Sequence, residues 1–244
     1  MKSIILTPSG TVDEYIYVKE IKTYIIKEEE IIVTLPSEQE DVTIIAKNNV
    51  SIFCGNSVKI ICDNYCIINC MNNCTIDCND YCKIHGENLI TVNCNNACFI
   101  DVKNKSKVSC QNNCKVNATS CCTIAMNNDN DIYCKNECNV VGNIKNNINA
   151  GTICMISLSS SNIVKIKDNT FLRIGGDTTN ITAIGDSIII ECISSYPYNI
   201  FNDITNGLII TPIKTYKTNK LTQGEIHVNK GKIKREYRVN TLEE

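Results

Sequence analysis

The chain has 244 residues, enough for one elongated domain or two small ones. Its formal net charge is −2, so it lacks the strong positive charge by which proteins attract nucleic acids or acidic membranes. It contains no run of 18 apolar residues, and we therefore expect no membrane span. The apolar run in residues 1–8 is too short for a signal peptide, so we expect a protein that is made in the cytosol.

The first 45 residues contain no cysteine and none of the repeat that follows them. They hold three short strand-like runs, at residues 15–18, 24–26 and 31–33. A stack of β-strands needs a cap over its open end, because an exposed sheet edge pairs with other chains. The sequence therefore predicts an N-terminal β cap at residues 1–45.

A repeat of eight residues then begins, and we assign residues 46–195 to it. An aliphatic residue occupies every eighth position without a miss. The series is Ile44, Ile52, Ile60, Ile68, Ile76, Ile84, Val92, Ile100, Val108, Val116, Ile124, Ile132, Val140, Ile148, Ile156, Val164 and Leu172. Many of these residues have a cysteine two positions before and after them, and asparagine or another polar residue lies halfway between them. The consensus is Asn-x-Cys-x-Ile-x-Cys-x, and a fixed short period of this kind is typical of repeat architectures.

The period fits strands and does not fit helices. Eight residues overshoot two helical turns by roughly 80°, whereas a strand repeats every two residues. The Cys, Ile and Cys of each unit are spaced i, i+2, i+4 and so point to one side of a strand. Asparagine tolerates left-handed backbone angles and bonds to its own backbone, as a sharp corner requires. Each octapeptide is predicted to form a five-residue strand and a three-residue corner.

Substitutions in the cysteine lattice indicate the size of one coil. When positions 16 residues apart are compared, the cysteines come first and the substitutions follow together: Cys62, Cys78, Cys94 and Cys110 are followed by Met126, Gly142 and Leu158. Steps of 24 residues scatter the substitutions. We therefore predict an all-β fold, a single-stranded parallel β-solenoid with two strands per 16-residue coil. A three-sided solenoid with 24-residue coils is the alternative.

The C-terminal part departs from the repeat. The eight-residue spacing slips near Gly176 and again around Gly185, and the composition changes after Pro197. Residues 214–244 are polar and rich in lysine. We predict a C-terminal cap or interaction arm at residues 196–244.

The cysteines are gained and lost in pairs across corners. A three-residue arc could bring its flanking Cα atoms about 5–6 Å apart, within disulfide reach, whereas positions i and i+4 along a strand lie about 13 Å apart. We therefore predict corner disulfides. The candidate pairs are Cys62/Cys66, Cys70/Cys74, Cys78/Cys82, Cys94/Cys98, Cys110/Cys114 and Cys134/Cys138.

Two alternatives to disulfides remain open. The cysteines can be small buried residues that fit a thin core. They can also bind zinc or an iron–sulfur cluster, since two stacked corners offer four thiolates. The candidate ligands are Cys62, Cys66, Cys78, Cys82, Cys94, Cys98, Cys110 and Cys114. Paired cysteines suit an oxidising setting, so we expect a cytosolic product that is oxidised later or incorporated into a virion or other assembled particle.

No combination of residues in the sequence points to catalysis. The two histidines, His85 and His227, are isolated, and the outward carboxylates Asp77, Asp101 and Asp131 do not share a column. An acidic cluster like that of a solenoid polysaccharide hydrolase is missing. There is no phosphate-binding loop and no Gly-x-Ser-x-Gly motif. We expect a protein that is not an enzyme, with no catalytic residue and no cofactor.

The octapeptides resemble those of parallel β-solenoids as a class, over roughly residues 44–190. Insect antifreeze solenoids also line a thin core with paired cysteines, and phage spike β-helices also use octapeptides. The composition, rich in Asn, Ile and Lys, is similar to that of proteins of large amoebal DNA viruses. A uniform ladder with two different ends and no reaction centre favours a structural or assembly protein of a virion, fibril, coat or surface layer. Its expected partners are itself or other structural proteins, bound through caps or solenoid edges. A metal- or thiol-binding module and a carbohydrate-binding or adhesin-like surface are the alternatives.

Overall fold

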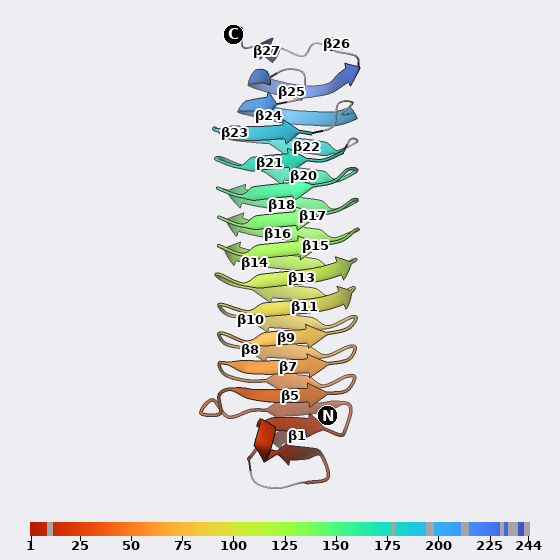
Figure 1. The fold of residues 1–244 in the computed structure, drawn as a ribbon, viewed down its shortest axis with the longest axis vertical. Coiled ribbons are helices and arrows are strands. Elements are labelled where there is room, and N and C mark those ends of the chain that lie inside the picture. Colours follow the sequence, from red (N-terminus) through yellow and green to blue (C-terminus); the bar gives the residue numbers. More distant parts are fainter. Residues whose placement is uncertain are drawn as a thin grey trace. The chain divides into compact units, whose positions relative to one another are not determined.

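The computed structural model describes residues 1–8, 12–176, 179–193, 198–210, 215–229, 232–233 and 239–241. These residues form almost only strands, and their one helical segment is a short 3-10 turn, η1 (Lys19–Ile21). The strands build a parallel β-solenoid of about 11 turns, which confirms the predicted fold class. The chain divides into two compact units, residues 1–122 and 123–244, and each is a stack of coils (Figure 1).

The strands of the first unit are mostly four to six residues long. They are β1 (Lys2–Ile5), β2 (Tyr15–Val18), β3 (Thr23–Ile26), β4 (Ile31–Thr34), β5 (Val42–Ala46), β6 (Ser51–Phe53), β7 (Val58–Cys62), β8 (Ile67–Cys70), β9 (Thr75–Cys78), β10 (Lys83–Gly86), β11 (Thr91–Asn96), β12 (Phe99–Val102), β13 (Lys107–Asn112) and β14 (Lys115–Ser120).

The second unit begins with similar short strands and ends with longer ones. They are β15 (Thr123–Met126), β16 (Asp131–Asn136), β17 (Asn139–Gly142), β18 (Asn147–Thr152), β19 (Met155–Leu158), β20 (Ile163–Ile166), β21 (Phe171–Ile174), β22 (Asn180–Ala183), β23 (Ile188–Cys192), β24 (Tyr198–Ile210), β25 (Thr215–Asn229), β26 (Lys232–Ile233) and β27 (Val239–Thr241).

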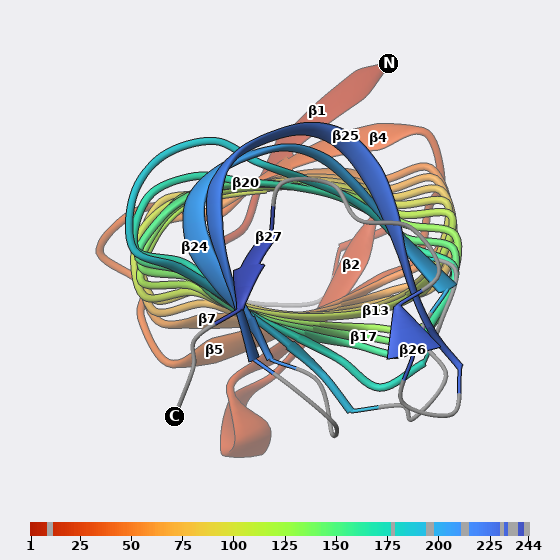
Figure 2. The ribbon, with the colours of Figure 1, turned by 90° about the horizontal axis from the view of Figure 1, so that it is seen from above.

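Strand pairing in the repeat follows a spacing of 16 residues. In the first unit Ile44 pairs with Ile60, and Ile60 pairs with Ile76, in parallel register. In the second unit Ile132 pairs with Ile148. Each coil therefore contains two strands, as predicted, and the 24-residue alternative is wrong. Viewed along the stack, successive coils of the first unit project onto one another (Figure 2).

The core of each coil is the eight-residue aliphatic series. Ile60, Ile68, Ile76 and Ile84 are each fully buried, and they come from the two facing strands of successive coils. Burying one such side chain contributes about 1.5–3 kcal/mol. A single octapeptide has nothing to bury this residue against, so the stack forms only as neighbouring coils come together.

The residue that turns the chain at each corner differs from the one we expected. We expected asparagine to adopt the left-handed conformation, but a different residue adopts it: Tyr65, which follows Asn64, has φ 61°, and Leu89, which follows Asn88, has φ 58°. The asparagine side chain instead bridges coils, because Oδ1 of Asn64 accepts the backbone N–H of Asp80 at 2.9 Å. The strand ladders do not reach this N–H group, so the side chain supplies its partner.

The N-terminal strands join the stack in parallel. β3 pairs with β5, where Thr23 lies opposite Thr43, and β1 pairs with β4. β2 lies antiparallel to β3, and Tyr24 is fully buried beside it, with a ring centroid 4.6 Å from that of Tyr17. Burial raises the pKa of Tyr24 to about 12. Paired residues are 20 positions apart between β3 and β5 and 29 between β1 and β4, so these coils are longer than those of the repeat.

At the C-terminal end of the repeat the coils also lengthen. Ile163 pairs with Asn180 and Phe171 pairs with Ile189, so extra residues enter the corners while the ladder continues. β24 pairs in parallel with both β22 and β23, and β25 then runs antiparallel to β24. This reversal ends the parallel stack. The predicted cap or arm at 196–244 lies partly outside the described residues, and the proposed boundaries at 45 and 195 remain predictions.

Candidate functional site: the cysteine corners

The lattice cysteines occupy two inward positions at each corner. We call the residue that ends one strand the upstream position, as Cys62, and the residue four places later the downstream position, as Cys66. Corners alternate between two edges of the coil. The corners around residues 64, 80, 96 and 112 form what we call the first edge of the first unit.

Downstream cysteines hydrogen-bond into the corner of the preceding coil. The thiol of Cys66 donates to the carbonyl of Lys47 at 3.1 Å, that of Cys82 to Asp63 at 3.2 Å, and that of Cys98 to Asn79 at 3.1 Å. A thiol is a weak donor. The carbonyls of Asp63 and Asn79 also accept a backbone N–H, from Asn79 at 3.4 Å and from Asn95 at 3.3 Å, so the thiol adds a second bond to them. The downstream thiol therefore has a structural task at each corner.

Other residue types perform this task where cysteine is missing. Asn146 donates its amide to Asn127 of the preceding coil at 3.0 Å and Thr170 donates to Gly151 at 3.3 Å, whereas the hydroxyl of Ser106 donates to Asn104 within its own corner at 3.5 Å. Sequence reasoning missed this role. The signal was present, because small hydrogen-bond donors replace cysteine at the downstream position in Ser106, Asn130, Asn146, Asn162 and Thr170.

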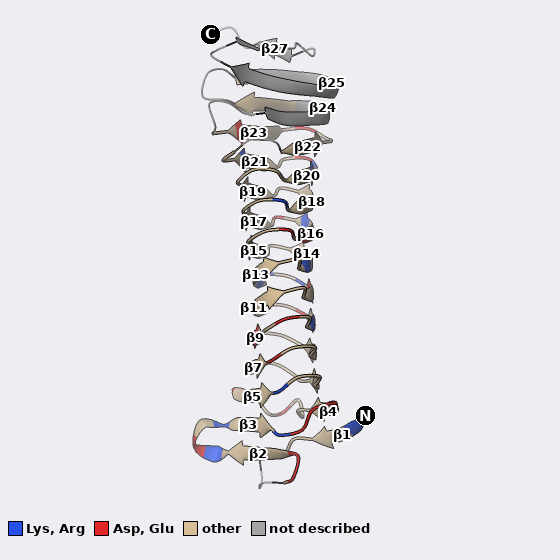
Figure 3. Cartoon of the chain, turned by 90° about the vertical axis from the view of Figure 1, so that its right-hand side faces the viewer, with Lys and Arg blue, Asp and Glu red and all other residues tan. Residues whose placement is uncertain are grey.

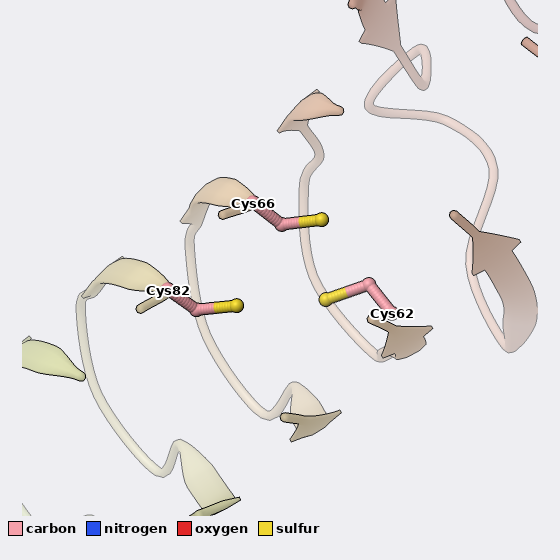
Figure 4. A group of neighbouring side chains, drawn as sticks. All are labelled: Cys62, Cys66 and Cys82. Atoms are coloured by element: carbon pink, nitrogen blue, oxygen red, sulfur yellow. The ribbon is translucent and has the colours of Figure 1, made fainter. Parts of the chain in front are cut away.

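Sulfur atoms from adjacent coils converge in two places on the first edge. The Sγ atoms of Cys62, Cys66 and Cys82 all lie within 4.8 Å of one another, and we call this group the first triad (Figure 4). The same holds for Cys94, Cys98 and Cys114, the second triad. All six cysteines are buried. Figure 4 shows Cys66 and Cys82 on one side of the corner, with the Cys62 thiol pointing toward them.

The remaining cysteines of the first edge link the two triads. The thiol of Cys78 interacts with Cys62 and Cys82 of the first triad and with Cys94 and Cys98 of the second, and its pKa is lowered to about 6, first by Cys62. Cys110 lies beside Cys114. The eight cysteines predicted as alternative metal ligands thus form one continuous row of sulfurs along the first edge.

The thiols modify one another's acidity. Hydrogen bonds from Cys62 and then Cys82 lower the pKa of Cys66 to about 4, and the bond to Cys66 raises the pKa of Cys62. In the second triad the pKa of Cys98 is lowered, first by its bond with Cys114, whereas that of Cys94 is raised. A buried thiolate is stable here only while neighbouring S–H groups donate to it. The first triad therefore favours one thiolate, at Cys66, beside two thiols, whereas in the second triad the pKa values of both Cys98 and Cys114 are lowered.

The predicted disulfides are not confirmed. All 17 cysteines lie in the described part of the chain, and none forms a disulfide. The structure does bring predicted partners together, since Cys62 and Cys66, Cys70 and Cys74, Cys78 and Cys82, Cys94 and Cys98, and Cys110 and Cys114 lie within hydrogen-bonding reach of each other. Cys134 and Cys138 both lie beside Cys154.

The outward residues considered in the sequence lie apart from the thiols. His85 has its Nδ1 3.8 Å from a carboxylate oxygen of Asp101, its ladder neighbour, and the pair is about half exposed. Asp77 belongs to another ladder, where it accepts an amide hydrogen bond from Asn93 at 2.7 Å. Charged side chains of both signs occur along the coils of each unit (Figure 3). The side chain of His227 lies outside the described residues.

In the described residues, no helix has the length and apolar character needed to cross a membrane. No family model, no curated protein and no solved structure matches the chain.

Proposed function

We propose that the chain is a non-enzymatic structural protein, incorporated into a larger assembly such as a virion, fibril, coat or surface layer. The observation that carries this proposal is the ladder of repeated contacts at the corners of the first unit, which runs from Asn48 to Asn96 at one edge and from Asn56 to Asn104 at the other. At the second edge, Oδ1 of Asn56 accepts both the backbone N–H and the side-chain amide of Asn72 at 3.1 Å, and Asn72 accepts the same two bonds from Asn88.

This arrangement suits a rigid building block. Each hydrogen bond contributes only about 0.5–1.5 kcal/mol, but every coil adds the same set. The aliphatic ladder inside and the asparagine ladders at the corners hold each coil to its neighbours. Contacts of this kind stabilise a stack as a sum of nearest-neighbour terms. A stack of such repeated coils favours a mechanical task over a chemical one.

The corners of the first edge also offer a surface for contact with other structural proteins or with another copy. Tyr65 and Tyr81 stack on each other with centroids 5.0 Å apart and an interplanar angle of 6°. Both lie at the left-handed corner position and are 55 % exposed. Exposed tyrosines are enriched at protein interfaces, because they bury a large area while ordering few bonds.

The proposal is tested by measuring assembly of the full chain. We expect sedimentation analysis and electron microscopy to show association that rises with concentration. The double change Tyr65→Ser with Tyr81→Ser should weaken it, whereas Tyr133→Ser, which removes an exposed tyrosine from a strand face of the second unit, should not. A chain that stays monomeric at every concentration and shows turnover abolished by one substitution would contradict the structural role.

A further inference from the structure

We propose that the first edge binds copper(I), a soft thiophilic ion, with one ion in the first triad and one in the second. The inference is separate from the structural role, since a scaffold needs no metal. It rests on the positions of six buried sulfurs. These are Cys62, Cys66 and Cys82, and Cys94, Cys98 and Cys114.

The sulfur spacing matches a metal site. Three thiolates about 2.3 Å from one metal ion lie about 4.0 Å apart when they surround it in a plane. The Sγ atoms of each triad are already within 4.8 Å of one another. Binding therefore requires only small rotations of the cysteine side chains, and the backbone ladders stay as they are.

The ligand set favours copper(I) over zinc. Each triad supplies three sulfurs, and soft thiolate ligands select ions such as copper(I). Structural zinc almost always takes four ligands. Cys66 and Cys82 are fully buried, so water is a poor fourth ligand at this depth. A three-coordinate ion of low charge fits such a site.

The two triads are built by the same rule. Each takes both sulfurs of one corner and the downstream sulfur of the next coil, so the second triad repeats the first at a spacing of 32 residues. In the sequence, the row of cysteines starts at Cys62, after the corner flanked by Ala46 and Val50. It ends at Cys114, before Met126 takes the next upstream position. Hydrogen bonding to corner carbonyls accounts for the downstream cysteines, since asparagine and threonine make the same bonds elsewhere. Metal binding gives the upstream Cys62 and Cys94 a role beside the packing of the corner.

The row borders the surface, and the charge of a loaded site is accounted for. Each copper(I) that binds three thiolates leaves a site with a net charge of −2, and the protons of ligands still in the thiol form are released to solvent. A surface depression lined by Asp63, Asp77 and the upstream residues Cys62, Cys78 and Cys94 borders the row.

The test uses the full chain, purified without oxidant and loaded with copper(I) in the absence of oxygen. Native mass spectrometry should show two copper ions per chain, with a new ultraviolet charge-transfer band from copper–thiolate bonds. Cys66→Ser should leave one ion, and Cys66→Ser with Cys98→Ser should leave none. Serine already occupies the downstream position at residue 106, where its hydroxyl donates to Asn104 as the thiols of Cys66 and Cys98 donate to Asn64 and Asn96, so these variants should fold.

The control is Cys122→Ser, which changes a downstream cysteine whose corner partner is Ala118 and should keep both ions. A second route is Cys94→Ala, since alanine already occupies the upstream position at residue 118, and it should leave one ion. The proposal is overturned if the double variant still binds two ions, or if zinc displaces copper(I). It is also overturned if each corner pair of the isolated protein lacks two hydrogens in mass, because the sulfurs would then be in disulfides.

Discussion

Asparagine and its neighbour divide the work of each corner between them. The asparagine side chain accepts the backbone N–H of the next coil, and the residue after it turns the chain in the left-handed conformation. That conformation costs a non-glycine residue roughly 1–2 kcal/mol. The cost is offset because the same residue donates its own N–H to the next coil, as Asn73 does to the carbonyl of Asn88 at 3.0 Å.

At this scale we predict the effect of removing one amide from the ladder. Asn72→Ala should lower the free energy of unfolding by about 1–3 kcal/mol, because the backbone N–H of Asn88 loses its acceptor. Asn72→Asp should cost less, since it keeps the acceptor, as Asp80 does for Asn96 at 2.8 Å. Asn73→Gly, one residue later, should change stability little or raise it, because glycine adopts the left-handed conformation freely. Chemical denaturation of the four proteins checks this order.

Packing inside each corner explains why cysteines occur in pairs across it. The upstream and downstream side chains share one volume. A Cβ atom on Gly86 would lie 2.6 Å from Cγ1 of Ile90, so the large downstream residue requires an empty upstream position. In the second unit a Cβ on Gly142 would lie 2.8 Å from Cε of Met126, one coil away. Residues at a corner therefore change together whether or not a bond joins them.

This shared volume predicts a coupled pair of substitutions. Gly86→Cys alone should destabilise the protein by about 1–3 kcal/mol through overpacking against Ile90. Adding Ile90→Cys should recover most of the loss, since it recreates the cysteine pair found at other corners. The coupling energy from the four proteins should fall at about 0.5–3 kcal/mol. Additive effects in the denaturation midpoints would show that the two positions do not share space.

Many similar noncovalent contacts stabilise each unit, and no disulfide contributes to its stability. None of the 17 cysteines is in a disulfide. The stability of each unit comes from the buried aliphatic ladder, from strand pairing and from the corner hydrogen bonds, all of which are insensitive to reductant.

We therefore predict that the melting temperature of the metal-free protein, purified without oxidant, is the same with and without a strong reductant. Calorimetry in paired samples measures this directly. A fall in the melting temperature on reduction would instead indicate the corner disulfides, because crosslinks over short loops stabilise by about 2–3 kcal/mol each. Measuring the thiol content of the same samples would then identify the bonded pairs.

The sequence determined the repeat and its stacking. A period of eight excludes a helix, and the columns of substitutions at spacing 16 set two strands per coil, because stacked coils place equivalent residues above one another. The tertiary structure decided what depends on neighbours far along the chain. Cys62 meets Cys82 only through the offset between coils, and periodicity alone cannot tell whether the asparagine or the next residue turns the chain. Outside the repeat, the longer N-terminal coils and the reversal at β25 lie where the sequence has no period, so long-range pairing alone sets their geometry.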